Sequence, residues 1–343
     1  MYPRGAIADR MPAAVGVVYC FSQMANSRPV LVAPAALGAA LRAPVVAAAI
    51  GRGLERAGAG VADLCPVAGG GRGTLEILLP ALGGATASAR VSDPLGREVV
   101  VGFGLVEDGA TAIVEAAQIG ADGTNPLAAS SYGTGQLVTA AIDAGAQVVV
   151  LACGDAAGCD GGAGAVEAIA SGGGLRGTTL VALCDERVSW EGAAARCAGT
   201  DDDTVRRLAR RLRQRAALLA CDPRGVPMTG AGGGLAGGLW AQIGARLVSG
   251  AAFVLEELGF AARMRAARAV VVGEARLDAT TLGGRVAGEI AIRARQSGVP
   301  CHAIAGAIAI EPFDVRILDL QAIVQAATVA ELESAGERLA QAL

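Results

Sequence analysis

Runs of aliphatic residues alternate with amphipathic stretches along most of the chain, a pattern typical of alternating strands and helices. Near the start, residues 30–35 (VLVAPA) and 61–67 (VADLCPV) predict strands, and each is followed by a helical pattern, the first over 44–58. Pro44 at the beginning of that helix and Gly58 at its end favour these boundaries. Successive strand–helix units of this kind predict a parallel sheet with right-handed connections.

The pattern changes at Gly83. Residues 85–117 alternate between apolar and polar positions and contain Asp-Pro, Leu-Gly and Asp-Gly turns, which predicts two or three antiparallel strands. Because hairpins replace parallel units here, we expect a second domain to begin. A loop over 120–136 then leads into a helix that ends at Gly145.

Residues 148–170, VVVLACGDAAGCDGGAGAVEAIA, predict a buried strand, a small-residue loop and a helix. In an open α/β sheet such a loop faces the ligand crevice, and the free N–H groups of the next helix attract anions. Asp155 and Asp160 in this loop could therefore handle a substrate or a metal-bound phosphate. An equally weighted interpretation is a Gly-rich turn that only lets strand and helix pack closely.

The rest of the middle segment contains a strand pattern over 178–186, an Arg-rich helix over 201–221 and a second Gly cluster over 229–244. The arginines are most simply a solvated helix face. The Gly cluster fits either a close approach between helices or a loop that admits a nucleotide, and its spacing does not decide between them.

Strand–helix units return in the last part of the chain, with strands over 268–274, 300–306 and 320–325 and a final helix from Val329. After the first of these strands, a loop presents two acids and an arginine: Glu274, Arg276 and Asp278. These groups could bind a ligand. In the structural alternative, Asp278 caps the next helix and Arg276 pairs with Glu274.

These patterns predict an α/β protein with two α/β domains. Residues 28–82 and 268–343 form one Rossmann-like domain with a parallel sheet, residues 83–267 form an inserted α/β domain, and residues 1–27 form a poorly ordered leader. The length of 343 residues agrees, because it exceeds what one typical core holds. Acid-bearing loops from both domains would then meet in a cleft, the usual place for a ligand.

Composition limits the partners and the catalytic groups that this protein can use. The net charge of −3 gives no electrostatic attraction to nucleic acid or an acidic membrane, and no apolar run reaches the roughly 18–20 residues of a membrane span. All 29 basic residues are Arg, which excludes a Lys Schiff base and a P-loop Lys. A bound phosphate would therefore be held by Arg, by backbone N–H groups or by a metal ion.

Cysteine and histidine usage adds little catalytic potential. The eight cysteines form no C-x-x-C pair and are typical of small buried hydrophobic residues in a reduced, cytoplasmic protein. The single histidine, His302, lies in an apolar run and is most simply a core residue, so a Ser-His-Asp triad has little support.

A series of motifs resembles the type I glycerate kinases, in the same order, from about Val30 to about Gly306. The most specific are NPLAASSYGTGQL (125–137) and GEARLDATTL (273–282). The resemblance implies two α/β domains with the site in the cleft between them. It also implies Mg²⁺-dependent transfer of the ATP γ-phosphoryl group to the 2-hydroxyl of D-glycerate or a related small hydroxy acid.

The resemblance also implies roles for individual residues. Catalytic roles are expected for four residues: Asp160, Glu274, Arg276 and Asp278. Asp160 is also the expected metal ligand. Substrate or phosphate binding falls on a larger set: Arg72, Ser130, Ser131, Tyr132, Gly133, Thr134, Gly161, Gly162 and Arg285. A homodimer is a further expectation.

The chain departs from the family pattern at charged positions. Where the family reads Pro-Asp-Ser-Phe-Lys-Gly, residues 34–39 read PAALGA, and where it reads Ala-Asp-Gly-Gly-Glu-Gly-Thr, residues 68–74 read AGGGRGT. Candidates to replace the lost Lys are Arg72, Arg276 and Arg285. Two hypotheses follow: a divergent but active kinase, or an inactive homologue that keeps the fold to bind a metabolite or a partner.

Overall fold

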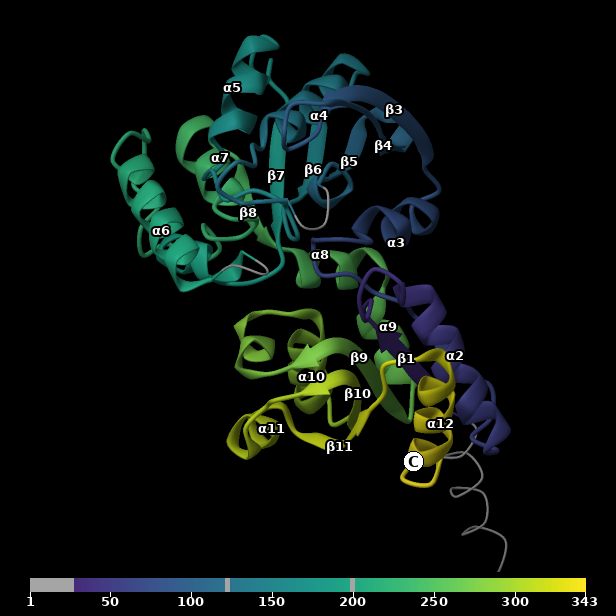
Figure 1. Ribbon diagram of the computed structural model, residues 1–343. Helices are drawn as coiled ribbons and strands as arrows, with labels where there is room; N and C mark the ends of the chain where they lie inside the picture. The colour runs from purple at the N-terminus through teal and green to yellow at the C-terminus, as the bar shows by residue number, and fades with distance from the viewer. Residues whose placement is uncertain (1–27, 121–123, 198–200) are drawn as a thin grey trace, which may run out of the picture.

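The computed structural model describes residues 28–120, 124–197 and 201–343. The predicted leader, residues 1–27, lies outside the described residues. The described chain folds around two β-sheets, one above the other in Figure 1.

The first sheet joins the two ends of the chain and has the strand order β11-β10-β9-β1-β2. Its strands are β1 (Val30–Pro34), β2 (Asp63–Leu64), β9 (Ala269–Leu277), β10 (Cys301–Ile308) and β11 (Leu320–Gln325). All its pairings are parallel, as predicted from the strand–helix repeats. One face packs against α2 (Ala43–Arg56) and α12 (Val329–Ala340). The other packs against α8 (Gly250–Glu257), α9 (Phe260–Ala266), α10 (Val286–Gln296) and α11 (Pro312–Leu318).

The second sheet comes from the middle of the chain, in the order β3-β4-β5-β6-β7-β8. Its strands are β3 (Ala85–Ser92), β4 (Glu98–Val106), β5 (Thr111–Glu115), β6 (Val148–Ala152), β7 (Thr179–Cys184) and β8 (Arg246–Ser249). The first three strands pair antiparallel and the rest parallel. One face carries α4 (Tyr132–Asp143), α5 (Ala163–Ser171) and α7 (Leu235–Ile243), and α3 (Thr74–Ala81) covers the other.

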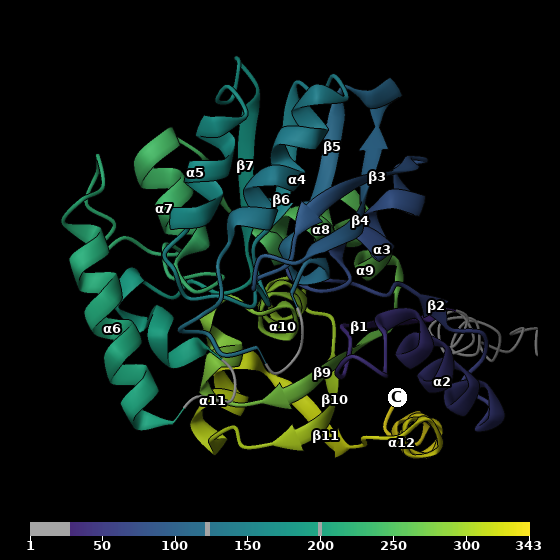
Figure 2. The same ribbon diagram turned by 45° about the horizontal axis from the view of Figure 1, so that its top comes forward.

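A satellite cluster extends the second sheet at one side. The 3-10 helix η3 (Trp190–Arg196) and the Arg-rich helix α6 (Asp202–Ala216) enclose Trp190, whose indole N–H donates to the carbonyl of Leu212. Figure 2 shows α6 at the outer margin of the molecule. The buried residues of α6 are apolar or small, so its arginines lie on the outer and flanking positions that the sequence predicts.

Two sheets with helices on their faces confirm the predicted fold class: the ends of the chain build one α/β unit and the middle builds another. The boundary residues between the two domains stay a prediction. Among the described residues, no helix is long and apolar enough to cross a membrane.

Two predicted details differ. Strand β9 continues to Leu277, so Glu274 and Arg276 lie on a strand rather than in a loop. The reason is that β10 pairs along it to Ile308, with Glu274 beside Ala305 and Arg276 beside Ala307. Conversely, only Asp63–Leu64 of the predicted strand 61–67 form a strand.

The buried His302 behaves as the composition predicts. It is 3% exposed, its Nδ1 has no hydrogen-bond partner, and burial lowers the pKa of the imidazole. The seven cysteines in the described part of the chain are free, and five of them are buried.

Candidate active site

Two cavities open between the sheets, at the carboxyl ends of their strands. The first cavity, about 560 Å³, lies between α2, α3 and the end of β9, and the second cavity, about 380 Å³, lies against η3 and the Gly230–Gly233 turn. Both are lined by the same four charged residues, Arg72, Asp155, Asp185 and Arg285. Two arginines and two aspartates therefore lie where the two cavities meet.

Asp155 and Asp185 come from adjacent parallel strands. Asp155 follows β6 and Asp185 follows β7, and β6 and β7 pair side by side. A Cβ on Gly154 would lie 2.7 Å from the Asp185 Cγ, so only glycine lets the loop pass this carboxyl. Burial, the neighbouring Asp155 charge and Glu186 raise the pKa of Asp185 to about 7.

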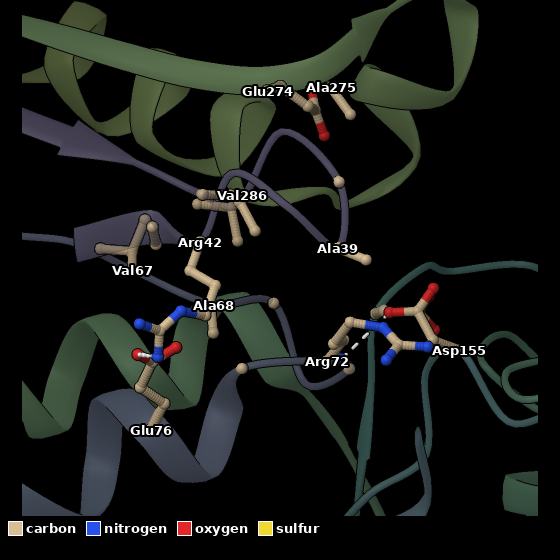
Figure 3. A pocket seen from close by; sticks show the side chains of 18 of the residues that line it. Ala39, Arg42, Val67, Ala68, Arg72, Glu76, Asp155, Glu274, Ala275 and Val286 are labelled. Carbon is tan, nitrogen blue, oxygen red and sulfur yellow. Dashed lines mark hydrogen bonds and ion pairs between the residues drawn. The ribbon is translucent and has the colours of Figure 1, made fainter. Parts of the chain in front are cut away.

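Arg72 belongs to the Gly-rich loop before α3. Its backbone N–H donates to Asp155 Oδ2 at 3.0 Å, and Figure 3 shows its side chain lying beside this carboxylate. A Cβ on Gly71 would lie 2.6 Å from the same oxygen, and Gly70 has a φ of +93° that favours glycine. The glycines of this loop thus bring Arg72 to the carboxylate.

Arg285 is held in a network of charges that joins the two sheets. Its Nε and Nη2 donate to Glu186 Oε1 at 2.9 and 2.7 Å, and Nη1 lies 3.9 Å from Glu274 Oε1. Arg196 Nε approaches the other Glu186 oxygen at 3.0 Å. Burial raises the pKa of Glu274 to about 7 despite the nearby Arg285.

Glu115, at the end of β5, also faces the first cavity. Its two carboxylate oxygens accept from the backbone N–H groups of Gly73 and Leu75, each at 3.0 Å. A carboxylate at the N-terminus of α3 is favourable there, and it fixes the loop that carries Arg72. Burial nonetheless raises the pKa of Glu115.

Asp160 lies apart from this charged centre and lines neither cavity. It is 5% exposed, and its oxygens accept from the Ser131 N–H and hydroxyl and from the N–H groups of Gly162 and Gly164, at 2.8–3.2 Å. Since four donors surround the carboxylate, the structure gives it the partners of a loop and helix cap. The predicted catalytic and metal-binding roles of Asp160 stay predictions.

The predicted phosphate loop around Ser130 likewise lines neither of the two cavities. Ser130, Ser131 and Thr134 line only a depression of about 10 Å³, and Tyr132 begins α4. Close packing accounts for three glycines: Cβ atoms would lie 1.8 Å from the Ser92 carbonyl oxygen at Gly133, 2.7 Å from the Trp190 side chain at Gly161 and 2.9 Å from the Leu235 carbonyl oxygen at Gly162.

The second Gly cluster makes close contacts with a loop, and its role in admitting a nucleotide stays a prediction. Cβ atoms on Gly232 and Gly233 would lie 2.3 and 2.1 Å from the carbonyl oxygens of Cys153 and Gly158, so the cluster packs directly on the loop after β6. The same turn lines the second cavity.

The two acids of the β9 segment, Glu274 and Asp278, lie in different surroundings. Glu274 lines the first cavity, whereas Asp278 caps the 3-10 helix η4 (Ala279–Gly283) through a capping box with Thr281. Arg276 pairs with Asp278 at 3.0 Å and not with Glu274 as the structural alternative predicts. Glu274 is buried beside Arg285 and Thr281, whereas the Arg276 side chain is exposed.

Of the predicted site residues, the structure therefore brings Arg72, Arg285 and Glu274 to the cavities. Asp155, which the sequence names beside Asp160 for handling a substrate or a metal-bound phosphate, lines both cavities. Six further charged residues line the cavities without being predicted from the sequence: Arg42, Glu76, Glu115, Asp185, Glu186 and Arg196. The signal for Asp185 was present, since an acid directly follows the buried strand TLVALC just as Asp155 follows the strand before it.

The donor set can be compared with what Mg²⁺ prefers. No group of three or more His, Cys, Asp and Glu side chains suited to a metal ion occurs in the described residues. Mg²⁺ usually binds through one or two carboxylates, its own waters and substrate phosphates. The neighbouring Asp155 and Asp185, whose like charges repel each other, fit that pattern.

Comparisons with known proteins identify one family. The sequence model of the Glycerate kinase family matches residues 30–174 and 189–343. The chain is 33% identical over 289 residues to glycerate kinase of Halalkalibacterium halodurans, covering 71% of this chain and 76% of that one. It is 29% identical over 324 residues to glycerate 2-kinase of Escherichia coli K12, covering 81% and 85%.

A solved structure extends the likeness to three dimensions. The crystal structure titled as that of a putative glycerate kinase 2 from Salmonella typhimurium LT2 superposes with a TM-score of 0.68 at 26% identity, covering 92% of this chain and 98% of that one. With the family pattern matched along nearly all of the described residues, the chain belongs to the glycerate kinase family.

Proposed function

We propose that this protein transfers the γ-phosphoryl group of ATP to the 2-hydroxyl of D-glycerate or a related small hydroxy acid. The observation that carries the proposal is the charged junction of two cavities, lined from both sides by Arg72, Asp155, Asp185 and Arg285. Phosphoryl transfer needs two substrates held end to end and their charge neutralised where they meet. A nucleotide in one cavity and a hydroxy acid in the other satisfy that requirement.

The four residues divide into two pairs by charge. Arg72 and Arg285 offer guanidinium groups to phosphate or carboxylate oxygens, for which Arg is well suited. Asp155 and Asp185 would hold Mg²⁺, which supplies positive charge to the phosphates. A carboxylate at this point also orients the acceptor hydroxyl and takes up its proton.

The same centre supports an active enzyme despite the family residues that are missing. The segment 34–39 places Ala35, Ala36, Gly38 and Ala39 on the first cavity, so the acid and the Lys of the family pattern are absent there. Carboxylates from Glu115, Asp155 and Asp185 nevertheless face the cavity, together with three arginines: Arg42, Arg72 and Arg285. No comparison favours the alternative of an inactive homologue.

The proposal gives three of the predicted catalytic residues positioning roles instead. Asp160 acts through position, by holding Ser131 and the start of α5 behind the cleft. Asp278 and Arg276 shape the end of β9. The homodimer and the cytoplasmic location stay predictions.

Purified protein mixed with ATP, Mg²⁺ and D-glycerate should release ADP, and NMR of the product should show a phosphate on the 2-hydroxyl. L-Glycerate is the control for stereochemistry, and omission of acceptor is the control for simple ATP hydrolysis. Absence of ADP release with D-glycerate and a panel of small hydroxy acids, together with no ATP binding by calorimetry, would refute the kinase and leave the inactive homologue.

A further inference from the structure

Two cysteine thiols lie together at the wall of the second cavity, although they are 38 positions apart in the sequence. Cys159 is fully buried in the loop before Asp160, and Cys197 is half-buried directly after η3. A hydrogen bond joins the two side chains, and both pack in the cluster around Trp190. Cys197 is the member of the pair that lines the cavity.

The hydrogen bonds and the burial of the two thiols differ. The Cys197 thiol also contacts the carbonyl oxygen of Ala193 at 3.7 Å, within its own short helix. The hydrogen bond from Cys159 lowers the pKa of Cys197. Cys197 lines the cavity and Cys159 is fully buried behind it, which is the arrangement of a reactive cysteine with a resolving partner.

We infer that Cys159 and Cys197 form a reversible disulfide when the protein meets a peroxide. The Cys197 thiolate attacks one peroxide oxygen, gives a sulfenic acid and releases water or hydroxide. The Cys159 sulfur then attacks the sulfenic sulfur, so that the S–S bond forms and a second water leaves. Overall, two thiols and one hydrogen peroxide give one disulfide and two waters, and a dithiol reductant reverses the change.

The position of the pair connects this oxidation to the cleft. Cys197 follows Arg196, whose Nε lies 3.0 Å from Glu186, and Cys159 precedes Asp160 in the loop after β6. A covalent S–S bond is about 2 Å long, so it draws the two segments closer than their hydrogen bond does. The inference stands on these contacts and does not depend on the kinase activity.

Mass spectrometry tests the bond directly. The full-length protein is treated with hydrogen peroxide, its remaining thiols are alkylated, and it is cut before Asp residues. Cleavage before Asp155, Asp160, Asp185 and Asp201 leaves Cys159 in the peptide 155–159 and Cys197 in the peptide 185–200, each without another cysteine. We expect these two peptides joined, and separated again by dithiothreitol.

Two variants test whether Cys159 is the specific partner of Cys197. In Cys159→Ala the buried partner is missing, so oxidised Cys197 should stop at the sulfenic acid and be trapped by dimedone. Cys221→Ser removes the exposed cysteine and should leave the cross-link unchanged. A Cys197 that stays fully alkylatable after peroxide treatment, or a disulfide that pairs it with any other cysteine, would overturn the inference.

Discussion

Glu186 accepts two hydrogen bonds from Arg285 across the space between the two sheets. Glu186 follows β7 of the second sheet, whereas Arg285 immediately precedes α10, which packs on the first. The carboxylate is 7% exposed, so it depends on its partners for the interactions that water would otherwise supply. The pair therefore ties the two halves of the cleft together at the junction of the cavities.

Replacing Arg285 by Ala should destabilise the protein by about 1–3 kcal/mol, because Glu186 keeps only Arg196 as a partner in a buried position. Urea unfolding measures the change. Arg90→Ala is the matched control, since Arg90 forms an exposed ion pair with Glu98 and its loss should cost under about 1 kcal/mol. Equal effects of the two variants would show that the inter-sheet pair contributes no more than a surface contact.

The carboxylates at the cavity junction should control turnover. Asp155→Asn and Asp185→Asn each remove a negative charge with little change of shape, and we expect each to lower kcat by about 10²–10³. Asp143→Asn, at an exposed pair with Arg176, is the control and should leave kcat unchanged. Full activity in Asp185→Asn would remove this residue from the proposed mechanism.

A variant of Asp160 distinguishes a positioning role for this residue from a catalytic role. In Asp160→Asn, an amide NH₂ replaces one oxygen among four donors, so unfolding should become easier by about 1–3 kcal/mol. At a temperature where the variant is folded, kcat should fall less than in Asp155→Asn. A folded Asp160→Asn protein of normal stability with no activity would restore the catalytic role that the sequence predicts.

The fold was largely predictable because its signals are local. Buried strands such as Val148–Ala152 are continuous apolar runs, and the hairpins of β3 to β5 alternate and carry turn residues, so both element types follow from sequence period. Helices α8 and α9 were not predicted. The segment that forms them is rich in helix-forming residues, and Gly259, with a φ of +60°, separates the two helices.

The site was less predictable because it depends on which loops meet. Asp155 and Asp160 are equivalent in sequence, both acids in one Gly-rich loop, but only Asp155 faces the cavities while Asp160 turns back to cap α5. Similarly, Glu274 and Arg276 share a strand face, whereas pairing of Arg276 with Asp278 depends on where β9 ends. These choices are set by strand length and tertiary packing rather than by residue type.

Gly133 tests the close packing behind the site. Alanine inside a helix is ordinarily more stable than glycine by about 1 kcal/mol, but a Cβ at Gly133 would lie 1.8 Å from the Ser92 carbonyl oxygen. Gly133→Ala should therefore lower the melting temperature and separate α4 from β3. Gly283→Ala is the control, because no atom lies within 4 Å of its added Cβ. A Gly133→Ala protein as stable as wild type would contradict this packing.

The last prediction concerns pH and Glu274, whose pKa burial raises to about 7 from an ordinary value of 4.5. The unfolded chain loses this proton at lower pH than the folded protein, so stability should fall as pH rises from about 4.5 to about 7 and then level off. A difference of that size corresponds to about 3 kcal/mol at most.

Glu274→Gln cannot titrate, so its free energy of unfolding relative to wild type should rise between about pH 5 and about pH 8. Chemical denaturation at both pH values measures the difference. His302→Gln is the control with the opposite sign: burial lowers the pKa of His302, so wild type loses stability from this group as pH falls below its ordinary value of 6.5. A constant difference between Glu274→Gln and wild type across this range would mean that Glu274 is ionised in the folded protein, balanced by Arg285.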